Sequence, residues 1–188
     1  MTTGMNISVR QVSIRAGHAR PLLLIVGLPL PGLTMPGQTS FARQVVDNCA
    51  ALLRVARHHN YPVAHFRRSI ADAKQFVESP RIFRPIRNEM VFEHAHASCY
   101  SSPEFERMTC FVDIPVLLVA GFGAYSTGLA TAIDATARQT KVMFVKQALA
   151  TSSGDLVTPP LISRIAASGG SFVNMRGALR EMREQVGL

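Results

Sequence analysis

The stretch VLLVAGFGAYSTGLATAIDA, residues 116–135, places hydroxyl side chains directly after the most apolar run of the chain. An apolar strand, a turn that contains glycine and a helix of small residues follow one another here. In α/β enzymes this arrangement brings a reactive side chain to the end of a central strand, beside the N-terminal N–H groups of the next helix. The turn carries Ser126 and Thr127 but no cysteine, histidine or carboxylate. A threonine nucleophile needs a base within hydrogen-bond reach, so a partner must come from elsewhere in the chain.

The segment HAHASC, residues 94–99, contains the groups that could act as this partner. His94 is a candidate base for Thr127, and Cys99 is a candidate nucleophile near His94 and His96. The same two histidines and Cys99 are acceptable zinc ligands, and residues two positions apart share a face of an extended segment. A buried structural cysteine is the simpler interpretation of Cys99.

Apolar runs alternate with helical patterns along the chain and predict the elements that would position these groups. Short apolar runs predict strands, and apolar residues recurring at intervals of three and four predict helices. The predicted strands are 22–26, 62–66, 90–93, 116–120, 142–145 and 171–173, and the predicted helices are 45–56, 103–108, 126–138, 159–168 and 175–186. Caps are expected at Ser102, Thr158 and Asn174, and a left-handed stop at Asn60. Residues 67–88 are predicted to form a long irregular excursion.

Six strands that alternate with helices through short connections predict an α/β fold. We expect a three-layer α-β-α sandwich around a mostly parallel six-stranded sheet, which is a Rossmann-like arrangement. Ligands of such sheets bind at the carboxyl ends of the strands. A length of 188 residues predicts a single domain spanning 1–188, with 1–20 as an N-terminal extension.

The composition limits the compartment and the partners. Three cysteines, Cys49, Cys99 and Cys110, with no C-x-x-C pair, indicate a reducing, cytoplasmic environment. No apolar stretch approaches the roughly 18 residues of a membrane span, so we expect no membrane partner. The net charge of +8 favours anionic partners. We do not expect nucleic acid among them, because the arginines form no dense block and no nucleic-acid motif is present.

The order and spacing of these motifs resemble the isochorismatase-like superfamily of cysteine hydrolases, which includes nicotinamidases, carbamoyl-amide hydrolases and isochorismate-cleaving enzymes. The resemblance covers residues 21–182, and its anchors are LLLIVG, VAHFRR, VFEHAHASCYSSPEFERM, and LLVAGFGAYSTGLATAIDATAR followed by VMFVKQALATSS. The last anchor is the most specific, because it matches the family at Gly121, Thr131, Ala132, Asp134 and Ala135. The resemblance implies a parallel sheet, a homo-oligomer (dimer or larger) and a pocket at the strand ends.

The resemblance also implies a catalytic triad, and all three of its positions are replaced in this chain. The family uses an aspartate at the end of the first strand, a lysine after the third and a cysteine in the turn. The cysteine thiolate attacks a carbonyl, the aspartate handles its proton, and the lysine lowers the thiol pKa. These positions fall on Gly27, His94 and Thr127. The vinyl-ether-cleaving branch dispenses with the cysteine but needs the aspartate as its acid, which Gly27 cannot replace.

The ligand pocket and the cofactor expectation follow from the same resemblance. The positions expected to line the pocket are Leu28, Pro29, His94, Ser98, Tyr100, Phe122, Gly123, Tyr125 and Thr127. Metal-binding members hold their ligands in an aspartate–histidine cluster after the second strand, where this chain reads HFRRSIADAKQF. We therefore expect no metal and no other cofactor. Arginines of the 67–87 excursion are candidates to receive a small anionic ligand or to pair with acids of a partner chain, and a solvated surface is the simpler interpretation for most of them.

Three interpretations of function remain open. The first is a catalytically inactive pseudo-hydrolase, kept as an oligomeric small-ligand-binding or scaffold module. The second is a divergent hydrolase of a small amide, ester or vinyl-ether substrate that uses His94 with Thr127 or Cys99. The third is a basic protein that binds an anionic partner. We favour the first, because losing three mutually dependent groups removes a mechanism rather than weakening it.

Overall fold

The computed structural model describes residues 21–28, 40–68, 81–94 and 97–184, and the expected N-terminal extension lies outside these ranges. The described residues contain one six-stranded sheet. Its strands are β1 (Leu22–Val26), β2 (Val63–Arg68), β3 (Met90–His94), β4 (Val116–Phe122), β5 (Lys141–Ala150) and β6 (Gly170–Val173). They lie in the order β3-β2-β1-β4-β5-β6, and every neighbouring pair is parallel. The predicted α/β fold with a parallel sheet is confirmed.

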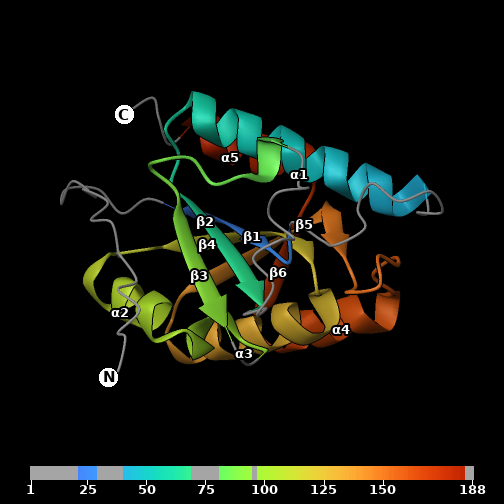
Figure 1. Cartoon of the computed structure of the whole chain (residues 1–188). Coiled ribbons are helices and arrows are strands. Elements are labelled where there is room, and N and C mark those ends of the chain that lie inside the picture. Colours follow the sequence, from blue (N-terminus) through green and yellow to red (C-terminus); the bar gives the residue numbers. More distant parts are fainter. Residues whose placement is uncertain (1–20, 29–39, 69–80, 95–96, 185–188) are drawn as a thin grey trace, which may run out of the picture.

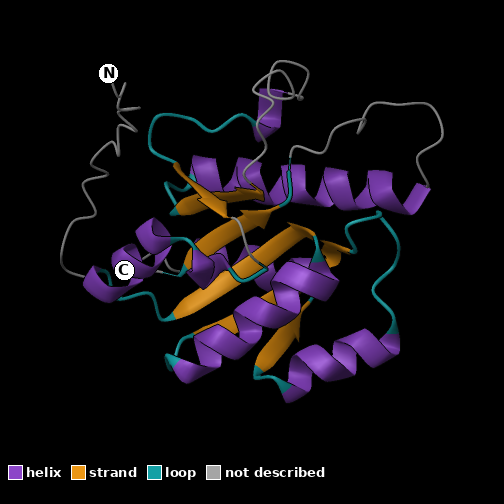
Figure 2. Ribbon diagram, turned by 60° about the horizontal axis from the view of Figure 1, so that its bottom comes forward, coloured by secondary structure: helices purple, strands orange, loops and turns teal. Residues whose placement is uncertain are grey.

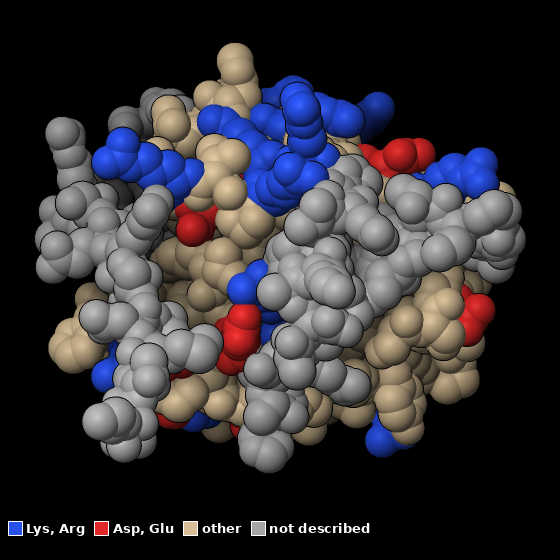
Figure 3. Space-filling model, viewed as in Figure 1, with Lys and Arg blue, Asp and Glu red and all other residues tan. Residues whose placement is uncertain are grey.

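Helices cover both faces of this sheet (Figures 1 and 2). One face carries α1 (Ser40–His58) and α5 (Met175–Glu184), and the other carries α2 (Pro103–Phe111), α3 (Leu129–Ala137) and α4 (Pro159–Ala167). Each face buries its own apolar cluster. All five residues of β1 are buried because both faces of this central strand are covered. In space-filling form, Lys and Arg side chains gather at the top of the molecule, over α1 (Figure 3).

Local sequence signals fix several element ends as predicted. Asn60 adopts the left-handed conformation with a φ of 51° and ends α1. Ser102 caps α2, because its hydroxyl accepts a hydrogen bond from the Phe105 N–H, and Pro103 occupies the first turn. Asn174 caps α5 in the same way through the Gly177 N–H. Thr158 is the N-cap residue of α4 with proline in the first turn, as predicted, although its side chain makes no capping hydrogen bond.

Two other predicted boundaries are wrong. The strand expected at 142–145 continues to Ala150 as β5, with extra residues opposite the Val119–Gly121 part of β4. The exposed Lys146 and Gln147 interrupt the apolar pattern there, which hides the continuation. The helix expected from Ser126 begins instead with a π-helical turn, Ala124–Gly128, before α3.

The ends of β1 and β4 approach one another very closely. Val26 of β1 pairs with Gly121 of β4. Gly121 has a φ of 121°, and a Cβ at this position would overlap the Val26 carbonyl oxygen. Only glycine fits such a site, because it lacks a Cβ and tolerates positive φ. The strand order reverses between β1 and β4, which is where open α/β sheets bind ligands.

We predict that Gly121→Ala lowers the free energy of unfolding by about 3 kcal/mol or more, because its Cβ collides with a strand backbone that cannot move away. Urea unfolding followed by circular dichroism measures this loss. The matched control is Gly128→Ala, since Gly128 has a helical φ of −63° and the nearest atom to a new Cβ is the flexible Phe144 ring at 3.3 Å. That variant is expected to change stability by less than about 1 kcal/mol. Equal losses in both variants would contradict the predicted role of Gly121.

Candidate functional site

Gly27 ends β1 in a conformation that leaves no room for a side chain. Its φ is 65°, and its N–H donates a hydrogen bond to the Phe66 carbonyl at 2.9 Å. A Cβ on Gly27 would lie 2.7 Å from the carbonyl oxygen of Phe122, at the end of β4. The backbone of β4 therefore occupies the space where a side chain at position 27 would begin, and an acid there would require the backbone to shift.

Thr127 lies in the π-helical turn that follows β4. The turn begins at Gly123, whose φ is 106° and whose carbonyl accepts hydrogen bonds from the N–H groups of Thr127 and Gly128. Thr127 is only 6% exposed. A Cβ built on Gly123 would lie 3.4 Å from the Thr127 Oγ1 and 3.8 Å from the Ser152 Oγ, so these two hydroxyls flank the same glycine. The Thr127 hydroxyl forms no hydrogen bond with the side chain of any described residue.

His94 is the last residue of β3, where its backbone pairs with Arg68 of β2. Glu93, its neighbour, points to solvent and pairs with Arg67 at 2.8 Å. The His94 side chain, His96 and Pro29 lie outside the described part of the molecule. A Thr127–His94 dyad therefore stays a prediction.

Cys99 lies in a short 3-10 turn, η3 (Cys99–Ser101), that packs against α3. Its N–H donates to the Thr131 Oγ1 at 3.0 Å, which ties the turn to the helix. The side chain is fully buried, and this burial raises the pKa of the thiol to about 12, although a separate side-chain hydrogen bond between the thiol and Thr131 opposes the shift. A thiol with such a pKa carries almost no thiolate at neutral pH, so it is a poor nucleophile.

Other residues expected at the pocket belong to the core. Tyr100 is 5% exposed, and the Arg138 guanidinium lies 4.5 Å from the centre of its ring. The Ser98 hydroxyl is used locally, as an acceptor for the Tyr100 N–H. Leu28 and Phe122 pack in the apolar cluster under α1. None of these four side chains is more than 8% exposed, so they are buried near the strand ends and do not line an open surface.

Tyr125, by contrast, is 58% exposed and stands beside a groove of about 470 Å³. The groove runs between the π-helical turn, the segment after β5 and the start of α4. Its lining residues are Tyr125, Thr151, Ser152, Ser153, Leu156, Thr158, Pro160, Leu161 and Arg164. The Arg164 guanidinium lies 5.9 Å from the centre of the Tyr125 ring. The groove thus combines an aromatic face, a cation and several hydroxyls. Sequence reasoning missed it, although the hydroxyl-rich TSSGD segment was a usable signal.

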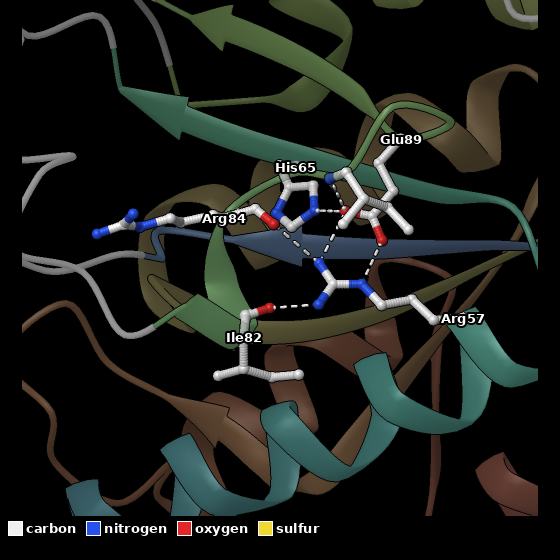
Figure 4. A network of polar contacts seen from close by, with 6 residues as sticks. Arg57, His65, Ile82, Arg84 and Glu89 are labelled. Atoms are coloured by element: carbon white, nitrogen blue, oxygen red, sulfur yellow. Dashed lines mark hydrogen bonds and ion pairs between the residues drawn. The ribbon is translucent and has the colours of Figure 1, made fainter.

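A buried polar network lies under α1, away from the turn (Figure 4). Glu89, just before β3, accepts two hydrogen bonds from the Arg57 guanidinium, at 2.7 and 2.9 Å. The His65 Nε2 lies 2.8 Å from the same carboxylate, and the Ile86 N–H donates to it at 3.1 Å. Arg57 also donates to the backbone carbonyls of Ile82 and Arg84. The network ties the segment after η2 (Arg81–Phe83) to α1 and β2.

The Glu89 carboxylate stays ionised inside this network. Its side chain is 3% exposed, and burial alone would raise its pKa. The hydrogen bonds from Arg57, His65 and the Ile86 N–H outweigh burial and lower the pKa to about 2. The His65 Nδ1 is buried without a partner among the described residues. Because the charges of Arg57 and Glu89 neutralise each other, we assign the network a structural role. Sequence reasoning missed it, since its members lie 24 and 32 residues apart.

Neither a metal cluster nor a membrane span is found in the described ranges. They contain no group of three or more His, Cys, Asp or Glu residues that could hold a metal ion. They also contain no helix that is both long and apolar enough to cross a membrane. The zinc interpretation of HAHASC is not tested, because His96 lies outside these ranges.

Comparison with known proteins agrees with the fold. A family model described as the isochorismatase domain matches residues 31–175. No curated protein sequence matches the chain. Among solved structures, a cysteine hydrolase from Pseudomonas syringae pv. phaseolicola 1448A is similar, with a TM-score of 0.73 and 15% identity over 88% of this chain and 93% of that chain.

Two further structures share the fold. An isochorismatase from Pseudomonas putida KT2440 has a TM-score of 0.69 and 19% identity over 84% of this chain and 89% of that chain. An N-carbamoylsarcosine amidase from Thermoplasma acidophilum has a TM-score of 0.66 and 17% identity over 83% of this chain and 96% of that chain. At these identities the structural likeness establishes the fold.

We predict that Glu89→Gln lowers the free energy of unfolding by about 3 kcal/mol at neutral pH, because it leaves the partly buried Arg57 charge without its partner. The folded-state pKa of Glu89, about 2, lies below its ordinary value of 4.5. The stabilisation by the carboxylate is therefore fully present above pH 4.5 and is lost as the pH falls toward 2. Urea unfolding at pH 7, 4.5 and 3 should show the difference between the two proteins shrinking.

The control is Glu93→Gln, since Glu93 and Arg67 form an ion pair with side chains 51% and 27% exposed. Exposed pairs contribute at most about 1 kcal/mol. If Glu89→Gln loses as little free energy of unfolding as this, or if its loss does not change with pH, the structural role assigned to the network is contradicted.

Proposed function

The chain belongs to the isochorismatase family, and from this premise we propose that it is a member without hydrolytic activity that keeps the fold to bind a small ligand. The observation that carries the proposal is Gly27. The family mechanism needs an acid at the end of β1, and here the Phe122 carbonyl stands 2.7 Å from where its Cβ would be. No side chain is available at that point to take a proton from a nucleophile or to give one to a leaving group.

The nucleophile position supports the same conclusion. The Thr127 hydroxyl forms no hydrogen bond with a described side chain, and a threonine nucleophile needs a base within hydrogen-bond reach. Cys99 is fully buried, and its thiol stays protonated because burial raises its pKa. Nucleophile, acid and cation act as one unit in this chemistry, so losing all three leaves no partial mechanism.

The groove beside Tyr125 supports ligand binding and indicates a ligand class. The half-exposed Tyr125 ring offers a stacking face, and the Arg164 guanidinium can bind a carboxylate through two parallel hydrogen bonds. The hydroxyls of Thr151, Ser152 and Ser153 add neutral donors and acceptors. We therefore propose a small aromatic carboxylate as the ligand class.

The assembly and the compartment are part of the same proposal. Family resemblance supports a homo-oligomer, dimer or larger. The three cysteines, none of which forms a disulfide, support a reducing cytoplasm.

We predict that the purified protein does not turn over amide, ester or isochorismate-type substrates, and that Gly27→Asp/His94→Lys/Thr127→Cys does not gain activity. The triple variant should also be less stable than Thr127→Cys alone, because position 27 lacks room for a side chain. Chromatography of the reaction products measures activity, and urea unfolding measures stability. Wild-type turnover that disappears in His94→Ala would refute the loss of hydrolysis and favour the divergent hydrolase.

We predict that benzoate, a simple aromatic carboxylate, raises the Tm of the wild type and not that of Arg164→Ala. A tenfold excess over Kd stabilises the fold by about 1.4 kcal/mol, which is about 3–5 °C for a chain of this size. Arg107→Ala is the control, because Arg107 is an exposed cation on α2, outside the groove. Benzamide keeps the aromatic ring without the carboxylate charge, and cyclohexanecarboxylate keeps the charge without the aromatic ring, so the two compounds test these features separately. An equal Tm rise in Arg164→Ala would exclude the groove as the binding site.

A further inference from the structure

Eight exposed arginines from three segments of the sequence meet on one face of the molecule. α1 packs against both α5 and η2, so these elements form a continuous surface over one side of the sheet. In Figure 3 this side is seen from its edge along the top of the view, where basic side chains gather. The exposed residues, called here the basic face, are Arg43, Arg54, Arg81, Arg84, Arg87, Arg176, Arg180 and Arg183.

The basic face carries a large excess of positive charge. Together with Arg57, these segments contain nine arginines but only four acidic residues, Asp47, Glu89, Glu181 and Glu184. Glu89 is buried and is already paired with Arg57. Ion pairs within the described ranges involve none of the following six members of the face: Arg43, Arg54, Arg81, Arg87, Arg176 and Arg183. Most of the positive charge is therefore exposed and unpaired within the described ranges, which favours an anionic partner.

The chemistry of the face indicates phosphate. Every cation on it is an arginine, whose planar guanidinium binds phosphate oxygens through two hydrogen bonds. On α5, Arg176, Arg180 and Arg183 share one side of the helix, while Ala178 and Met182 are buried on the other. The helical rise separates successive arginines along this side by about 6 and 4.5 Å. Such a row suits a partner that presents several phosphates in line.

We infer that the basic face binds the phosphate backbone of a nucleic-acid duplex without reading its sequence. Single strands are held largely by aromatic stacking, and the exposed aromatic side chains of the described residues, Phe111 and Tyr125, lie on other elements. Membrane-surface helices insert apolar side chains, and the apolar side of α5 is buried in the core. A duplex backbone needs neither feature.

This inference revises the expectation drawn from the sequence. No dense basic block or nucleic-acid motif is visible there because the arginines come from residues 43–54, 81–87 and 176–183. Folding brings them together. Contacts that bind phosphates and ignore bases need no recognition motif.

The experiment measures fluorescence anisotropy of labelled 20-base-pair DNA and RNA duplexes across a salt series. We predict salt-dependent binding by the wild type, and a loss of affinity of at least tenfold in Arg176→Glu/Arg183→Glu at 50 mM salt. The slope of log K against log salt should fall by about 2, one unit for each phosphate contact removed. Arg43→Glu/Arg54→Glu, on α1, should give a similar loss and guards against a folding defect of α5.

The matched control is Arg107→Glu/Lys141→Glu, which changes the net charge equally on α2 and at the start of β5. It should retain wild-type affinity within about twofold. An equal loss of affinity in all three double variants would show that net charge, and not the basic face, accounts for binding, and would overturn the inference. Binding of the protein to vesicles with 30% phosphatidylserine is measured in parallel. Binding to vesicles and not to either duplex, or binding to neither, would overturn the inference.

Discussion

At the carboxyl ends of β1 and β4 two backbones approach so closely that neither Gly27 nor Gly121 has room for a Cβ. This contact joins the two central strands at the point where the strand order reverses. It also fixes where the turn after β4 begins, and hence where Thr127, Tyr125 and the groove stand. The carboxyl end of the sheet is thus shaped by a backbone contact that excludes a side chain from the end of β1.

The sequence predicted well those features that depend on short-range signals. The apolar runs identified all six strands, and residues such as Asn60, Ser102 and Asn174 marked helix ends by their own backbone chemistry. It predicted poorly what depends on distant partners. The continuation of β5 past Lys146, the π-helical turn and the Arg57–Glu89–His65 network are set by packing between segments far apart in the chain.

The predictions for the candidate site show the same difference between short-range signals and contacts of distant segments. The family motif located Gly27 and Thr127, because glycine-containing strand ends are visible in sequence. It could not show that the space at position 27 is filled by the Phe122 carbonyl, since this depends on the register of two strands. The groove lined by Arg164 was missed for a similar reason: α4 and the turn after β4 meet only in the folded molecule.

The left-handed backbone at Gly27 makes the proposed loss of hydrolysis difficult to reverse. At position 127 a side chain of nearly the right size is already accommodated, and a single substitution could return a thiol there. At position 27 a substitution to aspartate meets the neighbouring strand before it can contribute any chemistry. A lineage that took this route would need to remodel its backbone before a carboxylate became useful. Under the proposed function, regaining hydrolysis would therefore require a backbone change at position 27 as well as new side chains.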